Sequence, residues 1–127
     1  MVQICVTTHI YEGGIGLKRA VMNLSKNLGS KGMDELFNKM ADFFNVLSES
    51  TRLRIMYAVC GGEKSVGEVV EHCGSSQANV SRQLSALYKA GILNRRKVGA
   101  TVYYSIADKS TVDMCQIVCA KMAKDLH

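Results

Sequence analysis

The chain has 127 residues, of which 47% are hydrophobic, and a formal net charge of +5. This length suits one domain with a small core, and no run of apolar residues is long enough to predict a membrane span. The N-terminus lacks the features of a signal peptide. We therefore expect a cytoplasmic protein whose five cysteines are thiols, and a dimer that covers apolar helix faces left exposed by so small a bundle.

Residues 1–33 are predicted to be a partly helical N-terminal extension. Leu17, Val21, Leu24 and Leu28 have the spacing of an amphipathic helix, which the glycines at 29 and 32 should interrupt. Residues 34–127 are predicted to form the main domain. Its first helix, over 34–47, has an apolar stripe wide enough to be shared between the core and a dimer interface.

Two short helices should follow. Ser50 is placed to cap the first, and Gly61 and Gly62 end it. Ser65 and Glu68 have the spacing of a capping box at the start of the second. The predicted apolar stripes are Leu53, Met56, Tyr57 and Cys60 in the first helix, and Val66, Val69, Val70 and Cys73 in the second.

The next stretch, 75–104, combines a polar helix with a basic hairpin. The helix over 76–88 should have an apolar stripe of Val80, Leu84, Leu87 and Tyr88, with the first three in the core, and should end at Gly91. The runs 92–95 and 101–106 predict two strands joined by a basic tip. Helix, short turn and helix, followed by such a hairpin, indicate a winged helix-turn-helix fold, which is mainly α with a small β-hairpin.

The charge is concentrated in this stretch. It contains five basic residues and no Asp or Glu, so the rest of the chain sums to zero. A positive helix and hairpin on a neutral body indicate a polyanionic partner. Gln, Asn, Arg and Ser are also the side chains that read base edges in the major groove, which favours double-stranded DNA.

The last helix is expected to begin near Ser110, with Asp113 completing a second capping box. Its apolar side chains occupy two neighbouring faces, which indicates a dimer contact against the first helix. These side chains are Val112, Cys115, Cys119 and Met122 on one face, and Met114 and Val118 on the other.

Three blocks of sequence resemble the ArsR/SmtB family of winged-helix repressors. SSQANVSRQLSALYKAGILNRRKVGATVYYSI is similar to the family's recognition helix and wing, LSESTRLRIMYAV to its second helix and EKSVGEVVEHCG to its third. The resemblance covers roughly residues 34–120, with Gln83 where the family usually has His. It implies a homodimeric repressor, not an enzyme, that binds an inverted-repeat operator and releases it when an inducer arrives.

We predict that the helix enters the major groove and that the hairpin reaches phosphates or the minor groove. Gln or Asn would suit adenine, and Arg82 would suit guanine or phosphate. The predicted DNA contacts are Ser76, Gln77, Asn79, Ser81, Arg82 and Gln83 from the helix, and Arg95, Arg96 and Lys97 from the hairpin.

The inducer site is predicted to use thiols. The family's Cys-x-Cys-Asp metal motif is replaced here by the capping box, and the last helix lacks the histidines of its zinc site. Cys115 and Cys119 are one turn apart, so a soft metal or metalloid ion could bind both, whereas a direct disulfide would be strained. Cys60 is the first candidate for a third thiol. A partner-chain cysteine, or Cys5 beside His9, is the alternative.

Persulfide or oxidant sensing fits the same thiols, and no resident cofactor is required. A regulator with purely structural cysteines remains open, as does a thiol-dependent metal-binding protein or enzyme, although the chain has no Cys-x-x-Cys. A winged-helix module for protein partners is a further alternative. The absence of acids from 75–104 disfavours it.

Overall fold

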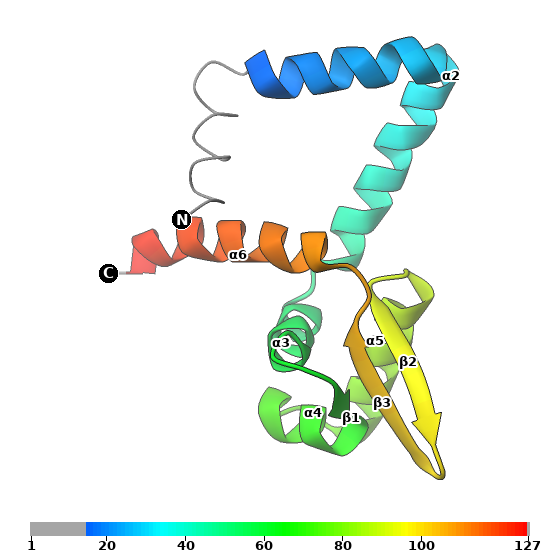
Figure 1. Cartoon of the computed structure of the whole chain (residues 1–127). Coiled ribbons are helices and arrows are strands. Elements are labelled where there is room, and N and C mark those ends of the chain that lie inside the picture. The colour runs from blue at the N-terminus through cyan, green and yellow to red at the C-terminus, as the bar shows by residue number, and fades with distance from the viewer. Residues whose placement is uncertain (1–14, 127) are drawn as a thin grey trace. The chain divides into compact units, whose positions relative to one another are not determined.

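The structure is a computed structural model that describes residues 15–126, and the chain divides after Asp42 into two compact units (Figure 1). Its helices and one small sheet confirm the predicted mainly helical class. In chain order the elements are α2 (Ile15–Val46), α3 (Ser50–Val59), β1 (Lys64–Ser65), α4 (Val66–Cys73), α5 (Gln77–Lys89), β2 (Leu93–Val98), β3 (Thr101–Ile106), α6 (Lys109–Ala123) and the 3-10 helix η1 (Lys124–Leu126).

Helix α2 is interrupted at Gly29, where the backbone has φ 71° and ψ 179°. This conformation is open to glycine and costly for residues with a Cβ, so the predicted break lies at its first glycine. The helix expected over 34–47 is the C-terminal part of α2 and ends at Val46. Among residues 15–126, no helix is both long and apolar enough to cross a membrane.

The core of the second unit lies between α3, α4, α5 and the sheet. Val80, Leu84 and Leu87 of α5 are fully buried, as predicted, whereas Tyr88, the last residue of the predicted stripe, is 37% exposed. Other members come from each neighbouring element. They are Leu47, Ile55, Met56, Val59, Val69, Cys73, Ile92, Leu93 and Tyr104.

The apolar stripe predicted for α3 is wrong except at Met56. The buried residues of this helix are Ile55, Met56, Ala58 and Val59, whereas Leu53 and Tyr57 are 45% and 81% exposed and Cys60 is exposed as well. Apolar residues occupy more than one face of α3, so the 3.6-residue period fits two different apolar stripes. The core packs against the stripe that was not predicted.

The sheet is antiparallel with strand order β1-β3-β2. Strand β2 continues to Val98 and pairs along its whole length with β3, from Leu93 opposite Ile106 to Val98 opposite Thr101. The turn is therefore Gly99 and Ala100, with φ 60° at the glycine, and the basic residues lie within the strand rather than at the tip.

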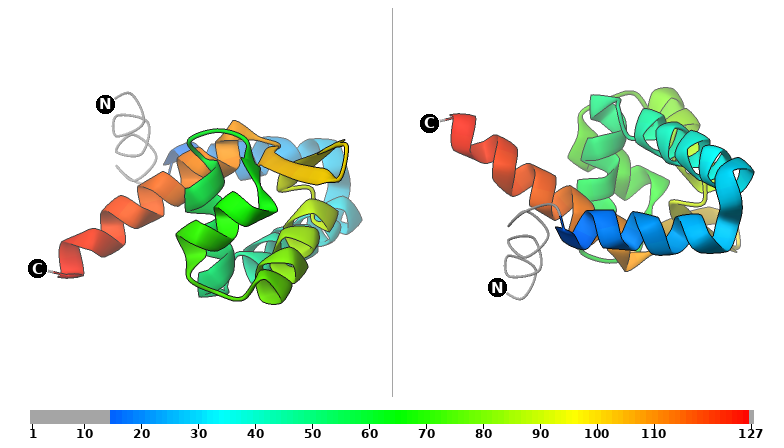
Figure 2. Two further views of the ribbon diagram at one scale, coloured as in Figure 1. Left: turned by 90° about the horizontal axis from the view of Figure 1, so that it is seen from below. Right: turned by 90° about the horizontal axis from the view of Figure 1, so that it is seen from above.

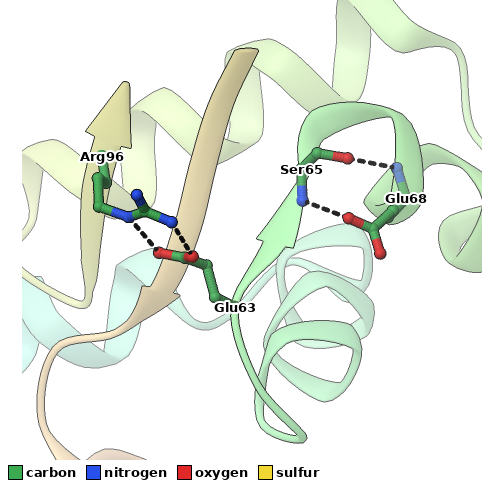
Figure 3. Close-up of polar contacts among 4 residues, drawn as sticks. All are labelled: Glu63, Ser65, Glu68 and Arg96. Carbon is green, nitrogen blue, oxygen red and sulfur yellow. Dashed lines mark hydrogen bonds and ion pairs between the residues drawn. The ribbon is translucent and has the colours of Figure 1, made fainter. Parts of the chain in front are cut away.

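The helix caps are partly as predicted. Ser65 and Glu68 form the capping box of α4, with each side chain accepting a hydrogen bond from the other's backbone N–H (Figure 3). The caps assigned to Ser50 and Ser110 are wrong, because Glu49 caps α3 and Asp108 caps α6, one and two residues earlier. In both cases a carboxylate takes the place of a hydroxyl, since it accepts from the helix N–H groups as well.

Candidate nucleic-acid interface

Helix α5 presents one face to the core and the other to solvent. Ser76 caps its N-terminus by accepting a hydrogen bond from the Asn79 N–H, at 3.2 Å. At its C-terminus the N–H groups of Gly91 and Ile92 donate to Tyr88 and Leu87, and Gly91 has φ 78°, as predicted for a glycine that ends a helix. With both ends fixed and three side chains buried, the polar face is held outward.

The predicted contact residues of α5 differ in exposure. Ser76, Gln77, Ser81 and Arg82 are exposed, while Asn79 and Gln83 are half-buried. The Asn79 side chain donates to Ser75 Oγ at 2.8 Å, and its Oδ1 accepts from Arg82 at 2.9 Å and from Gln83 at 3.4 Å. Asn79 therefore orients its neighbours on the helix, with its oxygen accepting two hydrogen bonds and its nitrogen donating one.

Arg52 of α3 adds a contact that the sequence pattern did not predict. Its Nε donates to Gln83 Oε1 at 2.7 Å and its Nη1 to the Val46 carbonyl at 3.0 Å. The only sequence signal for this contact was that Arg52 lies outside the predicted apolar stripe. That position is equally typical of an arginine exposed to solvent.

The three basic residues of the hairpin do not share one face. Side chains alternate along a strand, so Arg95 and Lys97 point to the side of α5 and Arg96 to the other side. The Arg95 guanidinium lies 4.1 Å from the centre of the Tyr88 ring of α5. Arg95 and Lys97 line a shallow hollow with Tyr88, Val102 and Tyr104.

Arg96 forms an ion pair with Glu63, the residue before β1 (Figure 3). Its Nε and Nη2 donate to the two carboxylate oxygens at 3.1 and 2.5 Å, and its guanidinium lies 5.2 Å from the centre of the Tyr103 ring. These hydrogen bonds lower the pKa of Glu63 and raise that of Arg96. Of the three basic side chains, only Arg96 has a carboxylate partner among the ion pairs of the described residues.

The candidate sensor thiols occupy different environments. Cys115 is half-buried against the core, and its burial raises the pKa of the thiol. Cys119, one turn later, is exposed, as is Cys60, whose Sγ donates to the Tyr57 carbonyl at 3.0 Å. Cys73 is buried in the core, as its position in an apolar stripe predicted, and desolvation raises the pKa of its thiol as well.

The described residues do not bring Cys60, Cys115 and Cys119 together as a three-thiol site. Between residues 15 and 126, no group of three or more His, Cys, Asp or Glu side chains is arranged to hold a metal ion. Cys60, Cys115 and Cys119 therefore do not meet as one set of ligands here. Cys5 and His9 lie outside the described residues.

Taken together, α4, its turn, the outward-facing α5 and the paired strands β2 and β3 form a winged helix-turn-helix DNA-binding domain. Residues 49–95 match the family model described as "Bacterial regulatory protein, arsR family". A cadmium resistance regulatory protein, the CadC homolog of Staphylococcus aureus, is 36% identical over 107 residues, which are 84% of this chain and 80% of that protein. The chain belongs to the ArsR family, whose members are DNA-binding transcriptional regulators and not enzymes.

Other relatives match over shorter stretches. A probable mercury resistance operon repressor of Streptomyces lividans is 36% identical over 77 residues, 61% of this chain. The chain covers 62% of that protein's length and 58% of the SmtB homolog of Synechocystis. Among solved structures, Rv0081 of Mycobacterium tuberculosis has a TM-score of 0.65 at 30% identity, over 72% of this chain and 92% of that one. BigR of Xylella fastidiosa has 0.64 at 26% identity, over 71% and 92%.

Proposed function

We propose that the protein is a transcriptional repressor that binds an inverted-repeat DNA operator as a homodimer and leaves it when an inducer reacts with its thiols. The observation that carries the proposal is the outward face of α5 beside the wing. It is polar, basic and free of acids, and its helix is anchored by three fully buried side chains. Such a surface fits a major groove and its phosphates.

The exposed residues of this surface are its first candidates for DNA contact. Gln77, Ser81 and Arg82 are exposed on α5, and Ser76 precedes them at the N-terminus, where backbone N–H groups suit a phosphate. From the wing, Arg95 and Lys97 are exposed on the side of α5. Asn79 and Gln83 act within the hydrogen-bond network, and Arg96 would reach a phosphate only by leaving Glu63.

The homodimer is supported by α6. Ile117, Val118 and Met122 are 37%, 50% and 49% exposed, although all three are apolar. A second copy would cover them and would also place two recognition helices about one DNA turn apart. If α6 forms the contact, Val118→Glu should convert a dimer to a monomer in sedimentation equilibrium, whereas Gln116→Glu, an exposed polar position nearby, should not.

The DNA-binding proposal is tested by selecting duplexes from a random pool with the full chain and measuring affinity for the best one. Arg82→Ala should weaken binding by about fivefold or more, because it removes a charged contact worth about 1–3 kcal/mol. The control is Lys109→Ala, which removes an exposed charge at the start of α6. Equal affinity for both variants would contradict the assignment of α5 as the DNA-reading helix.

The thiol proposal rests on Cys115 and Cys119, and on the relatives whose names refer to cadmium and mercury resistance. A soft ion fits two thiolates at this spacing, and a further ligand would come from Cys60 after a rearrangement, from a partner chain or from Cys5 with His9. No resident cofactor is needed, since the metal or metalloid ion would be the inducer.

The test compares Cys115→Ser, Cys119→Ser and Cys60→Ser in DNA-release assays with cadmium, arsenite and polysulfide. Loss of release in the Cys115 or Cys119 variant, with DNA affinity unchanged, is the expected result. Release retained in every variant would remove the thiol hypothesis. It would leave a regulator of this family whose cysteines are structural.

A further inference from the structure

A chain of hydrogen bonds connects the end of α2 to the polar face of α5. It runs from the Val46 carbonyl to Arg52, from Arg52 to the Gln83 amide, and from Gln83 to Asn79. Asn79 in turn accepts from Arg82. The side chain in the middle of the proposed DNA-reading face is thus held by an arginine that is itself off that face.

The chemistry of arginine fixes the orientation of the Gln83 amide. A guanidinium has only N–H donors, so the group that it meets at 2.7 Å has to be the amide oxygen. The amide nitrogen then points the other way, where it lies 3.4 Å from Asn79 Oδ1. This assignment does not depend on distinguishing nitrogen from oxygen in the coordinates.

Arg52 is held in place from its other side. Val46 is the last residue of α2, and a carbonyl in the last turn of a helix has no partner within the helix. Arg52 Nη1 supplies that partner at 3.0 Å. A planar guanidinium fixed at two points leaves little freedom to the amide that it contacts.

The consequence concerns which base edge Gln83 can read. A glutamine that recognises adenine accepts from N6–H with its oxygen and donates to N7 with its nitrogen. Here the oxygen is turned toward Arg52, off the reading face, so the bidentate adenine geometry is lost and the nitrogen, which has a second N–H besides the one near Asn79, is the group left to meet a base. A lone donor can still meet adenine N7, but guanine presents two acceptors, N7 and O6, at this edge and suits a donor best. Asn79 is unavailable for adenine as well, because its oxygen already accepts from Arg82 and Gln83.

We propose that Arg52 is a specificity-determining positioning residue that turns Gln83 into a hydrogen-bond donor, so that the protein prefers guanine to adenine at the base facing Gln83. The inference rests on the proposed DNA-binding function and deepens it. It replaces our sequence-based expectation that Gln83 suits adenine.

The experiment selects binding sites from a fully randomised duplex pool with four full-length proteins. These are the unaltered chain, Arg52→Met, Gln83→Ala and Arg54→Met. Arg54 is an exposed arginine on the same helix and serves as the matched control. At one position of each half-site, the unaltered chain and the Arg54 variant should favour guanine over adenine, and the Gln83 variant should lose the preference.

In Arg52→Met the Gln83 amide can rotate, so adenine should rise at that position by about tenfold relative to guanine, as expected for one gained bidentate contact. The dependence of affinity on salt should stay the same, because Arg52 contacts no phosphate. An Arg52→Met/Gln83→Ala protein should match Gln83→Ala alone. An unchanged base profile in Arg52→Met, with only a lower melting temperature, would overturn the proposal and leave Arg52 a purely structural cap of α2.

Gln83→Glu keeps the test valid if Arg52→Met fails to fold. The carboxylate can still accept from Arg52, but its other oxygen cannot donate, so the preference should move to cytosine or adenine, which offer amino groups. Guanine selected as before would contradict the inference. If the unaltered chain selected no sequence at all, the proposed function would fail, and this result is distinct from either outcome.

Discussion

Helices α5 and α6 are of similar length but differ in how much of their apolar surface is buried within one chain. In α5 the side chains of Val80, Leu84 and Leu87 are fully buried, and most of the polar ones face solvent. In α6 the only buried residue is Thr111, and apolar side chains remain exposed toward its C-terminus. In both views of Figure 2 that end of α6 extends beyond α3, α4 and α5. A single chain therefore buries the apolar core face of α5, whereas α6 has an exposed apolar surface that a second copy would cover.

The largest effect should come from the inner face of α5. Leu84 is fully buried, so Leu84→Ala removes packed methyl groups and leaves a cavity, which should lower the free energy of unfolding by about 2–5 kcal/mol. Urea denaturation measures this change. The control is Leu53→Ala, the same substitution at a side chain that is 45% exposed.

The control should cost less than about 1 kcal/mol, as is usual for a surface position. A loss at Leu53 as large as that at Leu84 would mean that the exposed face of α3 is covered in solution. Helix α3 would then resemble α6 in having an apolar surface that a second molecule covers.

A second prediction concerns the thiols along α6. Burial raises the pKa of Cys115, so it holds less thiolate at neutral pH than an unburied thiol, and its side chain is less accessible. Alkylation of the native protein should therefore modify Cys119 faster than Cys115. Mass spectrometry of digested samples gives the rate for each site.

Cys73 and Cys60 provide a matched pair outside α6. Cys73 is buried with a raised pKa and should react slowly, and exposed Cys60 should react fast. Raising the pH should accelerate alkylation of Cys73 and Cys115, because more thiolate forms, and unfolding in urea should remove the differences. Equal protection of Cys115 and Cys119 in the native protein would indicate that a second copy covers α6 at the experimental concentration.

The elements of this fold follow from local signals, whereas the contacts of the site do not. The capping box at Ser65, the glycine at 91 and the buried triplet of α5 each depend on residues close together in the sequence, and all were predicted correctly. The face of α3 that enters the core was not, because its apolar residues fit two stripes. Choosing between them requires knowing where the neighbouring helices lie.

The site was predicted at the level of helix and wing, but its polar contacts were not. The Arg52–Gln83 hydrogen bond spans 31 residues and the Arg96–Glu63 pair 33. Neither contact produces a periodic pattern in the sequence, because a single arginine or glutamate is equally typical of a position exposed to solvent. Strand alternation, in contrast, could have separated Arg96 from Arg95 and Lys97 had the strand been extended to Val98.

The smallest expected effect concerns the wing beside α5, where one of three basic side chains is already paired. Glu63→Gln should free Arg96 for a phosphate, and the slope of log affinity against log salt on random duplex DNA should steepen by about 0.9, the value for one added phosphate contact. Glu71→Gln is the matched control, because it removes the same charge from an exposed residue of α4. Only a difference between the two variants reports on Arg96, since both raise the net charge equally.

Acid should act in the same direction. The pKa of Glu63 is lowered by its hydrogen bonds to Arg96, so the pair persists above the ordinary carboxyl pKa of 4.5 and is lost as the pH falls through the lower value of the folded state. The Arg96 Nε–H resonance, followed by NMR below pH 4.5, should shift in the unaltered protein and be insensitive to pH there in Glu63→Gln. If the slopes of the two variants coincide while this resonance behaves as expected, Arg96 serves only to hold the wing against the residue before β1. The DNA contacts of the wing would then come from Arg95 and Lys97, on the side that faces α5.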